Sequence, residues 1–98
     1  MTTFFCVTAI TGNALVRAAV KQHFTEVYEL GSSIWFIADK TVPESTPTQI
    51  RDKLGLTAEG LGAQGVQGLV IKSVGTSGFA PTDLWEWFKI QRQGDSNG

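Results

Sequence analysis

Cysteine and histidine are scarce in this chain, whose 98 residues contain one of each. A single cysteine cannot form a disulfide within the chain, and no cluster of cysteine and histidine is present to bind zinc. Cys6 lies inside the most hydrophobic stretch of the sequence. We therefore interpret it as a small buried residue in a reducing compartment, and not as a reactive thiol.

Excess charge and long apolar runs are absent as well. The formal net charge is −1 and the isoelectric point is near 5.7, so nucleic-acid binding would need a local basic patch. No segment approaches the roughly 20 apolar residues of a membrane span. The N-terminus lacks the basic region of a signal peptide. These features predict a cytoplasmic protein with no membrane contact.

The remaining composition is that of an ordinary globular protein, with 42% hydrophobic and 17% charged residues. A chain of this length can bury one modest core but not two. We predict a single domain over residues 1–93. Residues 94–98, a short glycine-containing polar end, are predicted to be a flexible tail.

The first half of the chain predicts a strand, a helix and a β-hairpin. Residues 3–10 are almost continuously apolar, which indicates a strand buried on both faces. A helical stripe of apolar residues follows over 13–23. Residues 25–30 read as an edge strand and residues 33–39 as a buried strand, and Gly31 supplies the turn between them.

The second half predicts a helix, a loop, a strand and a last helix. Thr46 and Gln49 have the spacing of a capping box, and Gly55 ends the helix that they begin. The glycine-rich residues 57–65 lack the pattern of a phosphate-binding loop, so we interpret them as a flexible loop. The chain continues with a strand over residues 68–74, a turn over residues 76–81 and a helix over residues 82–93 that Pro81 opens.

This order of elements predicts the fold class. A β-α-β-β-α-β sequence is the ferredoxin-like arrangement, an α+β fold with an antiparallel sheet, and the last helix is an addition to it. In that topology the first and third strands are central. The two most apolar strands, residues 3–10 and 33–39, are the ones that this fold places there.

Both faces of the predicted sheet are apolar. Alternate residues of a strand point to opposite faces, so Phe5 and Val7 share one face while Phe4 and Cys6 share the other. Two helices can cover only one face, and the second needs the C-terminal helix or a second copy of the chain. We favour a homodimer. The aromatic residues predicted for the dimer or partner interface are Trp35, Trp85, Trp87 and Phe88.

Four segments together resemble a known family. SSIWFIADKT, TPTQIRDKL, GLVIKSV and GFAPTDLWEWFK are similar to segments of the compact proteins related to CRISPR-associated protein 2, some of which are SinR-like and stand outside CRISPR loci. The resemblance spans most of residues 3–89. It implies a ferredoxin-like homodimer that packs through sheet surfaces. Some members are metal-dependent nucleases, and others bind nucleic acid or a protein partner.

The chain departs from the nuclease members at one position. Those members carry an aspartate at the end of the first strand, and the dimer brings two together around a divalent metal. Residues 8–11 of this chain are Thr-Ala-Ile-Thr, which offer no carboxylate for a hard cation. We therefore predict no catalytic residue, no metal site and no cofactor. Asp39, at the end of the third strand, is the one candidate substitute, although an acid that solubilises a strand end is the stronger interpretation.

Three hypotheses about function follow from these observations. The first is a non-catalytic homodimeric interaction module that binds a protein partner; size and the resemblance suggest a phage or mobile-element regulator or inhibitor of host machinery. The second is a nucleic-acid-binding protein, and the third is a degenerate metal-dependent nuclease that uses Asp39. The residues predicted to contact phosphates in the second hypothesis are Arg17, Lys21, Arg51 and Lys53.

Overall fold

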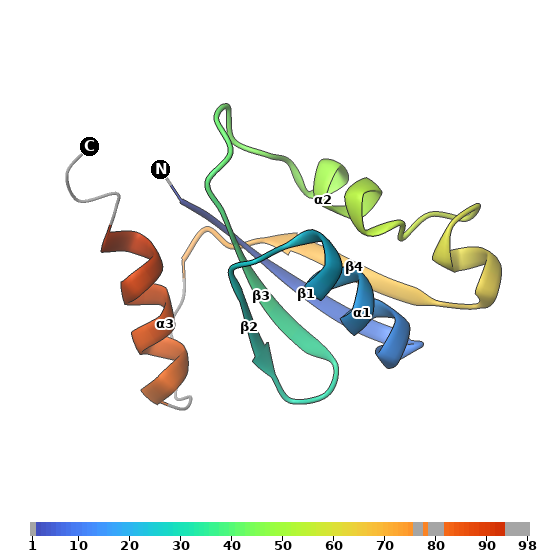
Figure 1. Ribbon diagram of the computed structural model, residues 1–98, viewed down its shortest axis with the longest axis horizontal. Helices are drawn as coiled ribbons and strands as arrows, with labels where there is room; N and C mark the ends of the chain where they lie inside the picture. The colour runs from blue at the N-terminus through green and yellow to red at the C-terminus, as the bar shows by residue number, and fades with distance from the viewer. Residues whose placement is uncertain (1, 76–77, 79–81, 94–98) are drawn as a thin grey trace.

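A four-stranded antiparallel sheet with helices on both faces forms the mixed α+β structure of the chain (Figure 1). The computed structural model describes residues 2–75, 78 and 82–93. The elements occur in the predicted order. They are β1 (Thr3–Thr11), α1 (Asn13–His23), β2 (Val27–Leu30), β3 (Ile34–Asp39), α2 (Pro47–Leu54), β4 (Gln67–Lys72) and α3 (Thr82–Arg92).

The sheet order is β2-β3-β1-β4, so β3 and β1 are the two central strands, as their apolar sequences predict. β1 pairs with β3 in a register that begins at Thr3↔Asp39 and ends at Thr8↔Ile34. On its other side β1 pairs with β4, from Phe5↔Lys72 onward. Because β1 has a hydrogen-bonded neighbour on each side and apolar residues on each face, it organises the whole domain.

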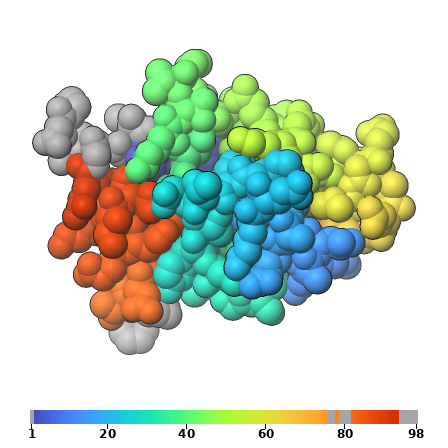
Figure 2. Space-filling model, viewed as in Figure 1, coloured from blue at the N-terminus to red at the C-terminus, as the bar shows by residue number. Residues whose placement is uncertain are grey.

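The first core lies between the sheet and the pair of helices α1 and α2. Trp35 and Val7 have no exposed surface there, and both point to the same face of the sheet. Figure 2 shows this side of the molecule, with the side chains of α1 and α2 spread over the sheet. The buried members of the core are Phe5, Val7, Ala9, Val16, Val20, Trp35, Ile37, Ile50, Leu54 and Val66.

The predicted capping box starts α2. The Thr46 hydroxyl accepts from the Gln49 backbone N–H at 3.2 Å, and the Thr46 N–H donates to the Gln49 side chain at 2.8 Å. Two backbone donors that the first helical turn leaves unpaired are thereby satisfied. This local device holds the short helix in place so that Ile50 and Leu54 reach the first core.

The second core lies on the opposite face, under α3. Of the two covers that the sequence left open, the C-terminal helix therefore takes part of this face. Phe88 is 2% exposed, and its ring meets Phe4 edge-on at 4.9 Å between centroids. Gln91 donates to Glu26 at 2.9 Å and accepts from the Thr2 hydroxyl at 3.2 Å. Around this anchor lie Phe4, Ala38, Leu84 and Phe88, with Tyr28, Leu30, Phe36, Trp85 and Trp87 partly buried beside them.

The glycine-rich loop has a defined backbone, whereas the sequence predicted a flexible segment. Its residues Leu61–Gln64 form a 3-10 turn, and the Gly62 N–H donates to the Thr57 carbonyl at 2.9 Å. A Cβ atom on Gly60 would lie 2.4 Å from the Gly55 oxygen, and one on Gly62 would lie 2.5 Å from the Thr57 oxygen. The loop therefore uses these glycines for close backbone packing rather than for freedom of motion.

Three predictions fall wholly or largely outside the described residues: the tail over 94–98, the turn over 76–81 and the role of Pro81. Among the helices in the described ranges, none combines the length and apolar character that crossing a membrane requires.

Removing the Phe88 ring tests whether α3 belongs to the folded core. Phe88→Ala deletes the centre of the second core, and we expect a loss of about 3–5 kcal/mol in the free energy of unfolding. Ile90→Ala on the same helix, where Ile90 is 56% exposed, should cost well under half as much. Urea unfolding followed by circular dichroism measures both. Equal effects of the two variants would mean that α3 does not pack as described.

Candidate interaction surface

The second face of the sheet is only half covered. α3 lies over the β2 and β3 side, and the β1 and β4 side presents the large exposed side chains Leu69 and Ile71, each 53% exposed. The register places Ile71 opposite Cys6 and Leu69 opposite Thr8. We call these four residues, Cys6, Thr8, Leu69 and Ile71, the open half-face.

Strand alternation explains why this region is apolar yet exposed. Val70 points to the first face and packs against the first core, so its neighbours Leu69 and Ile71 must point to the second face. Helix α3 is anchored near β2, the edge strand farthest from β4, by contacts to β2 and by the Gln91–Glu26 hydrogen bond. Its residues in the second core therefore contact β2, β3 and the first part of β1.

The chemistry of the open half-face is limited to burial of apolar surface and weak polar contacts. Within it, the Cys6 sulfur lies 3.7 Å from the Thr8 hydroxyl oxygen. None of its four residues carries a carboxylate or a basic group. Such a surface can hold neither a hard cation nor a phosphate, but it can pack against another apolar protein surface.

The structure buries two of the four predicted aromatic interface residues and leaves the other two partly buried. Trp35 is fully buried in the first core, and its indole N–H donates to Glu29 at 3.1 Å. Phe88 is buried in the second core. Neither can contact a partner from where it lies, because the strand and helix periodicities turn both toward the core. Trp85 and Trp87 are partly buried, with Trp87 at 5.8 Å from the Phe4 ring.

The sequence patterns did not single out Leu69 and Ile71, which the structure shows to be exposed. Both were visible in the segment GLVIKSV as alternate apolar residues of one strand, together with the intervening Val70. The exposure of Leu69 and Ile71 could not be predicted from this pattern, because it depends on α3 covering the β2 and β3 half of the same sheet face. The local signal identified a strand with two apolar faces, but not the face that remains open.

The four predicted phosphate-binding residues each have a partner within the chain. The Arg17 guanidinium lies 2.6 Å from a Glu29 carboxylate oxygen, and the Lys21 ammonium lies 3.6 Å from the other oxygen. Arg51 pairs with Asp52, the next residue, at 2.7 Å. Lys53 stands over the Phe24 ring at 4.9 Å. These contacts place basic groups beside carboxylates or an aromatic ring, which lowers the positive potential available to a phosphate.

Glu29 is the shared acceptor of this region. The hydrogen bond from Arg17 is the main reason why the pKa of the Glu29 carboxyl lies below its ordinary value, and the indole N–H of Trp35 adds to the same effect. One carboxylate on the edge strand β2 thus links α1 to a residue of the buried core.

Asp39 lies at the wrong end of the sheet to replace the missing carboxylate. It opposes Thr3 at the start of β1, whereas residues 8–11 lie at the other end of that strand, about 17–26 Å away for a rise of about 3.3 Å per residue. One of its oxygens accepts from the Thr41 hydroxyl at 2.7 Å, and the other is buried with no hydrogen-bond partner. Within the residues that the structure describes, no three acidic, histidine or cysteine side chains gather to hold a metal.

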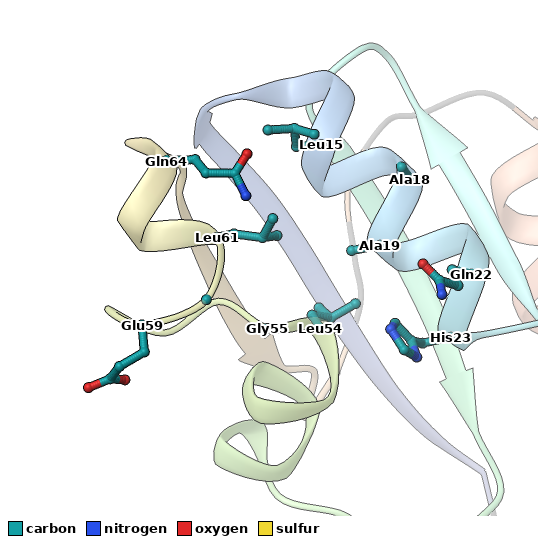
Figure 3. Close-up of a pocket in the computed structure, with 11 residues that line it drawn as sticks. Leu15, Ala18, Ala19, Gln22, His23, Leu54, Gly55, Glu59, Leu61 and Gln64 are labelled. Atoms are coloured by element: carbon teal, nitrogen blue, oxygen red, sulfur yellow. The ribbon is translucent and has the colours of Figure 1, made fainter.

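An open groove of about 500 Å³ lies on the helical side, between α1 and the glycine-rich loop. Leu15, Ala19 and Leu61 line its apolar part, and His23 stands at one end (Figure 3). Glu59, the only carboxylate in its lining, extends away from His23 in this view. Because the lining contains no nucleophilic hydroxyl or thiol beside the histidine, the groove has no arrangement for nucleophilic catalysis.

Comparison of the chain with models of protein families, with curated proteins and with solved structures finds no match.

The lowered pKa of Glu29 predicts a pH-dependent contribution to stability. A carboxyl whose pKa is lower in the folded state stabilises the fold above its ordinary pKa, near 4.5, and the stabilisation is lost as the pH falls through the folded-state value. We therefore expect Glu29→Gln to lower the urea midpoint near pH 7 and to have less effect near pH 2.5. Glu59→Gln, a change at an exposed loop carboxylate, is the control. A Glu29→Gln effect that is the same at both pH values would exclude this role of the charge.

The pairing of the basic residues predicts weak nucleic-acid binding. We expect labelled duplex DNA and RNA to show no salt-sensitive binding in fluorescence anisotropy, with or without Mn²⁺, because Arg17 and Lys21 already face Glu29. Tight binding that Arg17→Glu with Lys21→Glu abolishes, while the circular dichroism spectrum stays unchanged, would overturn this expectation.

Proposed function

We propose that this protein is a non-catalytic interaction domain that forms a homodimer and binds a protein partner through its open half-face. The observation that carries the proposal is the exposure of Leu69 and Ile71 on a sheet face whose other half is packed under α3. Apolar side chains grouped on one face of a sheet gain free energy when another surface removes them from water.

The proposal includes a ferredoxin-like fold and a relationship to CRISPR-associated protein 2. The antiparallel order with β1 and β3 in the middle supports this fold class, as does the placement of α1 and α2 on one face. Members of that family pack through sheet surfaces, and in this chain α3 occupies the β2 and β3 half of the second sheet face. A dimer related to theirs would therefore use the β1 and β4 side of the sheet. The phage or mobile-element setting rests on size and resemblance alone.

The arrangement of charged groups favours this proposal over the two alternatives. Phosphate binding would have to compete with Glu29 for Arg17 and Lys21, and with Asp52 for Arg51. A nuclease would need a carboxylate where residues 8–11 offer hydroxyl and apolar groups, and Asp39 is a strand length away. Binding an apolar protein surface requires no such rearrangement.

A charge placed on the open half-face should prevent dimer formation. Ile71→Asp would place a carboxylate against the apolar side chains of the second copy, so we expect the dimer dissociation constant to rise at least about tenfold, which corresponds to about 1.4 kcal/mol. Sedimentation velocity over a concentration series measures it.

Ile90→Asp is the matched control, because Ile90 is 56% exposed and Ile71 is 53% exposed, but Ile90 lies on α3. It should leave the dimer unchanged. If the wild-type protein stays monomeric up to about 1 mM, its free energy of association is weaker than about −4 kcal/mol. That result would contradict the proposed homodimer.

A further inference from the structure

Strand β4 forms an edge of the sheet. Its pairing with β1 indicates which of its residues direct their backbone N–H and C=O groups toward β1 and which direct them outward. The Ser73 N–H donates to the Phe4 carbonyl at 2.8 Å, next to the pair Phe5↔Lys72. In an antiparallel pair, alternate residues exchange hydrogen bonds with the neighbouring strand. Leu69 and Ile71 therefore direct their backbone groups toward β1. The backbone groups of Gly68, Val70 and Lys72 point outward from the edge.

This edge has little protection against pairing with another strand. Natural edge strands usually carry charges, prolines or bulges, or lie under another element. The other edge, β2, carries Glu29 and contacts α3, whereas the helix that contacts β4, α2, lies with its buried residues on the first sheet face. β4 carries a single charge, Lys72, at its end, where it pairs with Glu44. In the sheet formed by the described residues, β4 has β1 as its only strand neighbour.

The β4 sequence is complementary to itself in one antiparallel register. If Val70 lies on a two-fold axis, Leu69 of one copy opposes Ile71 of the other, and Gly68 opposes Lys72. The outward backbone groups of residues 68, 70 and 72 then form three reciprocal pairs. Each Lys72 faces a glycine, which has no side chain to obstruct it. The two Lys72 residues are four positions apart along the paired strands, about 13 Å, so their repulsion is small.

We propose that two copies of the chain pair antiparallel along β4, with Val70 on the two-fold axis, to form one continuous sheet. This inference rests on the homodimer of the proposed function and adds its geometry. Leu69 and Ile71 pack against each other across the new strand pair on the open half-face. The two open half-faces become one apolar strip, which is the surface that a protein partner meets. Dimer formation and partner binding thus use the edge and the face of the same strand.

Cysteine cross-linking tests the register. In a Cys6→Ala background, Leu69→Cys and Ile71→Cys chains are prepared separately, one of them with a mass tag, and are mixed under mild oxidation. Directly opposed, non-hydrogen-bonded residues have Cα atoms about 4.5 Å apart, which suits a disulfide. Two copies of Leu69 would be diagonal neighbours about 7–8 Å apart, near or beyond the usual limit. We expect the mixed disulfide dimer to form at least about tenfold faster than either self-linked dimer.

A backbone variant tests the edge hydrogen bonds without relying on cross-links. Lys72→Pro removes an outward N–H that does not bond to β1, while Lys72→Ala removes the same side chain and its Glu44 contact but keeps the N–H. We expect Lys72→Pro to raise the dimer dissociation constant at least about tenfold over Lys72→Ala, with unchanged circular dichroism for both.

The outcomes separate the two proposals. In one outcome the wild type sediments as a dimer while the cysteine variants cross-link equally well in all combinations, or do not cross-link at all. That result would overturn the β4 pairing but would still support the homodimer. A Lys72→Pro protein that is folded and as dimeric as Lys72→Ala would also overturn it. A wild-type protein that never dimerises would instead contradict the proposed function on which this pairing rests.

Discussion

The central strand β1 is apolar on both faces, and this one constraint organises the rest of the molecule. Its first face is covered by α1 and α2, which bury Phe5 and Val7 completely. Its second face begins under α3, where Phe4 meets Phe88, and continues without that cover at Cys6 and Thr8, which lie beside the exposed Ile71 and Leu69. The domain therefore supplies one full cover and one partial cover. An apolar surface in contact with water remains, and it is the feature most suited to a partner.

Polar contacts between described side chains hold the elements around this strand. Glu29 joins α1 to the core residue Trp35 through two hydrogen bonds, and Gln91 joins α3 to Glu26. Of the basic residues predicted to contact phosphates, Arg17 and Lys21 face Glu29 and Arg51 pairs with Asp52. Their charges are therefore partly neutralised within the fold. Residues 8–11 offer no carboxylate for a hard cation.

Much of the architecture could be predicted from local patterns. The order of strands and helices, the capping box at Thr46 and Gln49, and the central positions of β1 and β3 all follow from periodicity, turn residues and apolar content. The candidate site was predicted less well. The sequence indicated an uncovered apolar face, but it pointed to Trp35 and Phe88, which are core residues, and it missed Leu69 and Ile71.

The difference has a physical cause. Periodicity and capping depend on residues within a few positions of one another, so the amino-acid order alone establishes the elements and their two apolar strand faces. The position of Asp39 opposite Thr3, the pairing of Arg17 with Glu29 and the seat of α3 beside β2 depend on contacts between distant segments. Such contacts form only when the chain folds in three dimensions. They leave Leu69 and Ile71 in the open and the outer edge of β4 without a neighbouring strand in the described sheet.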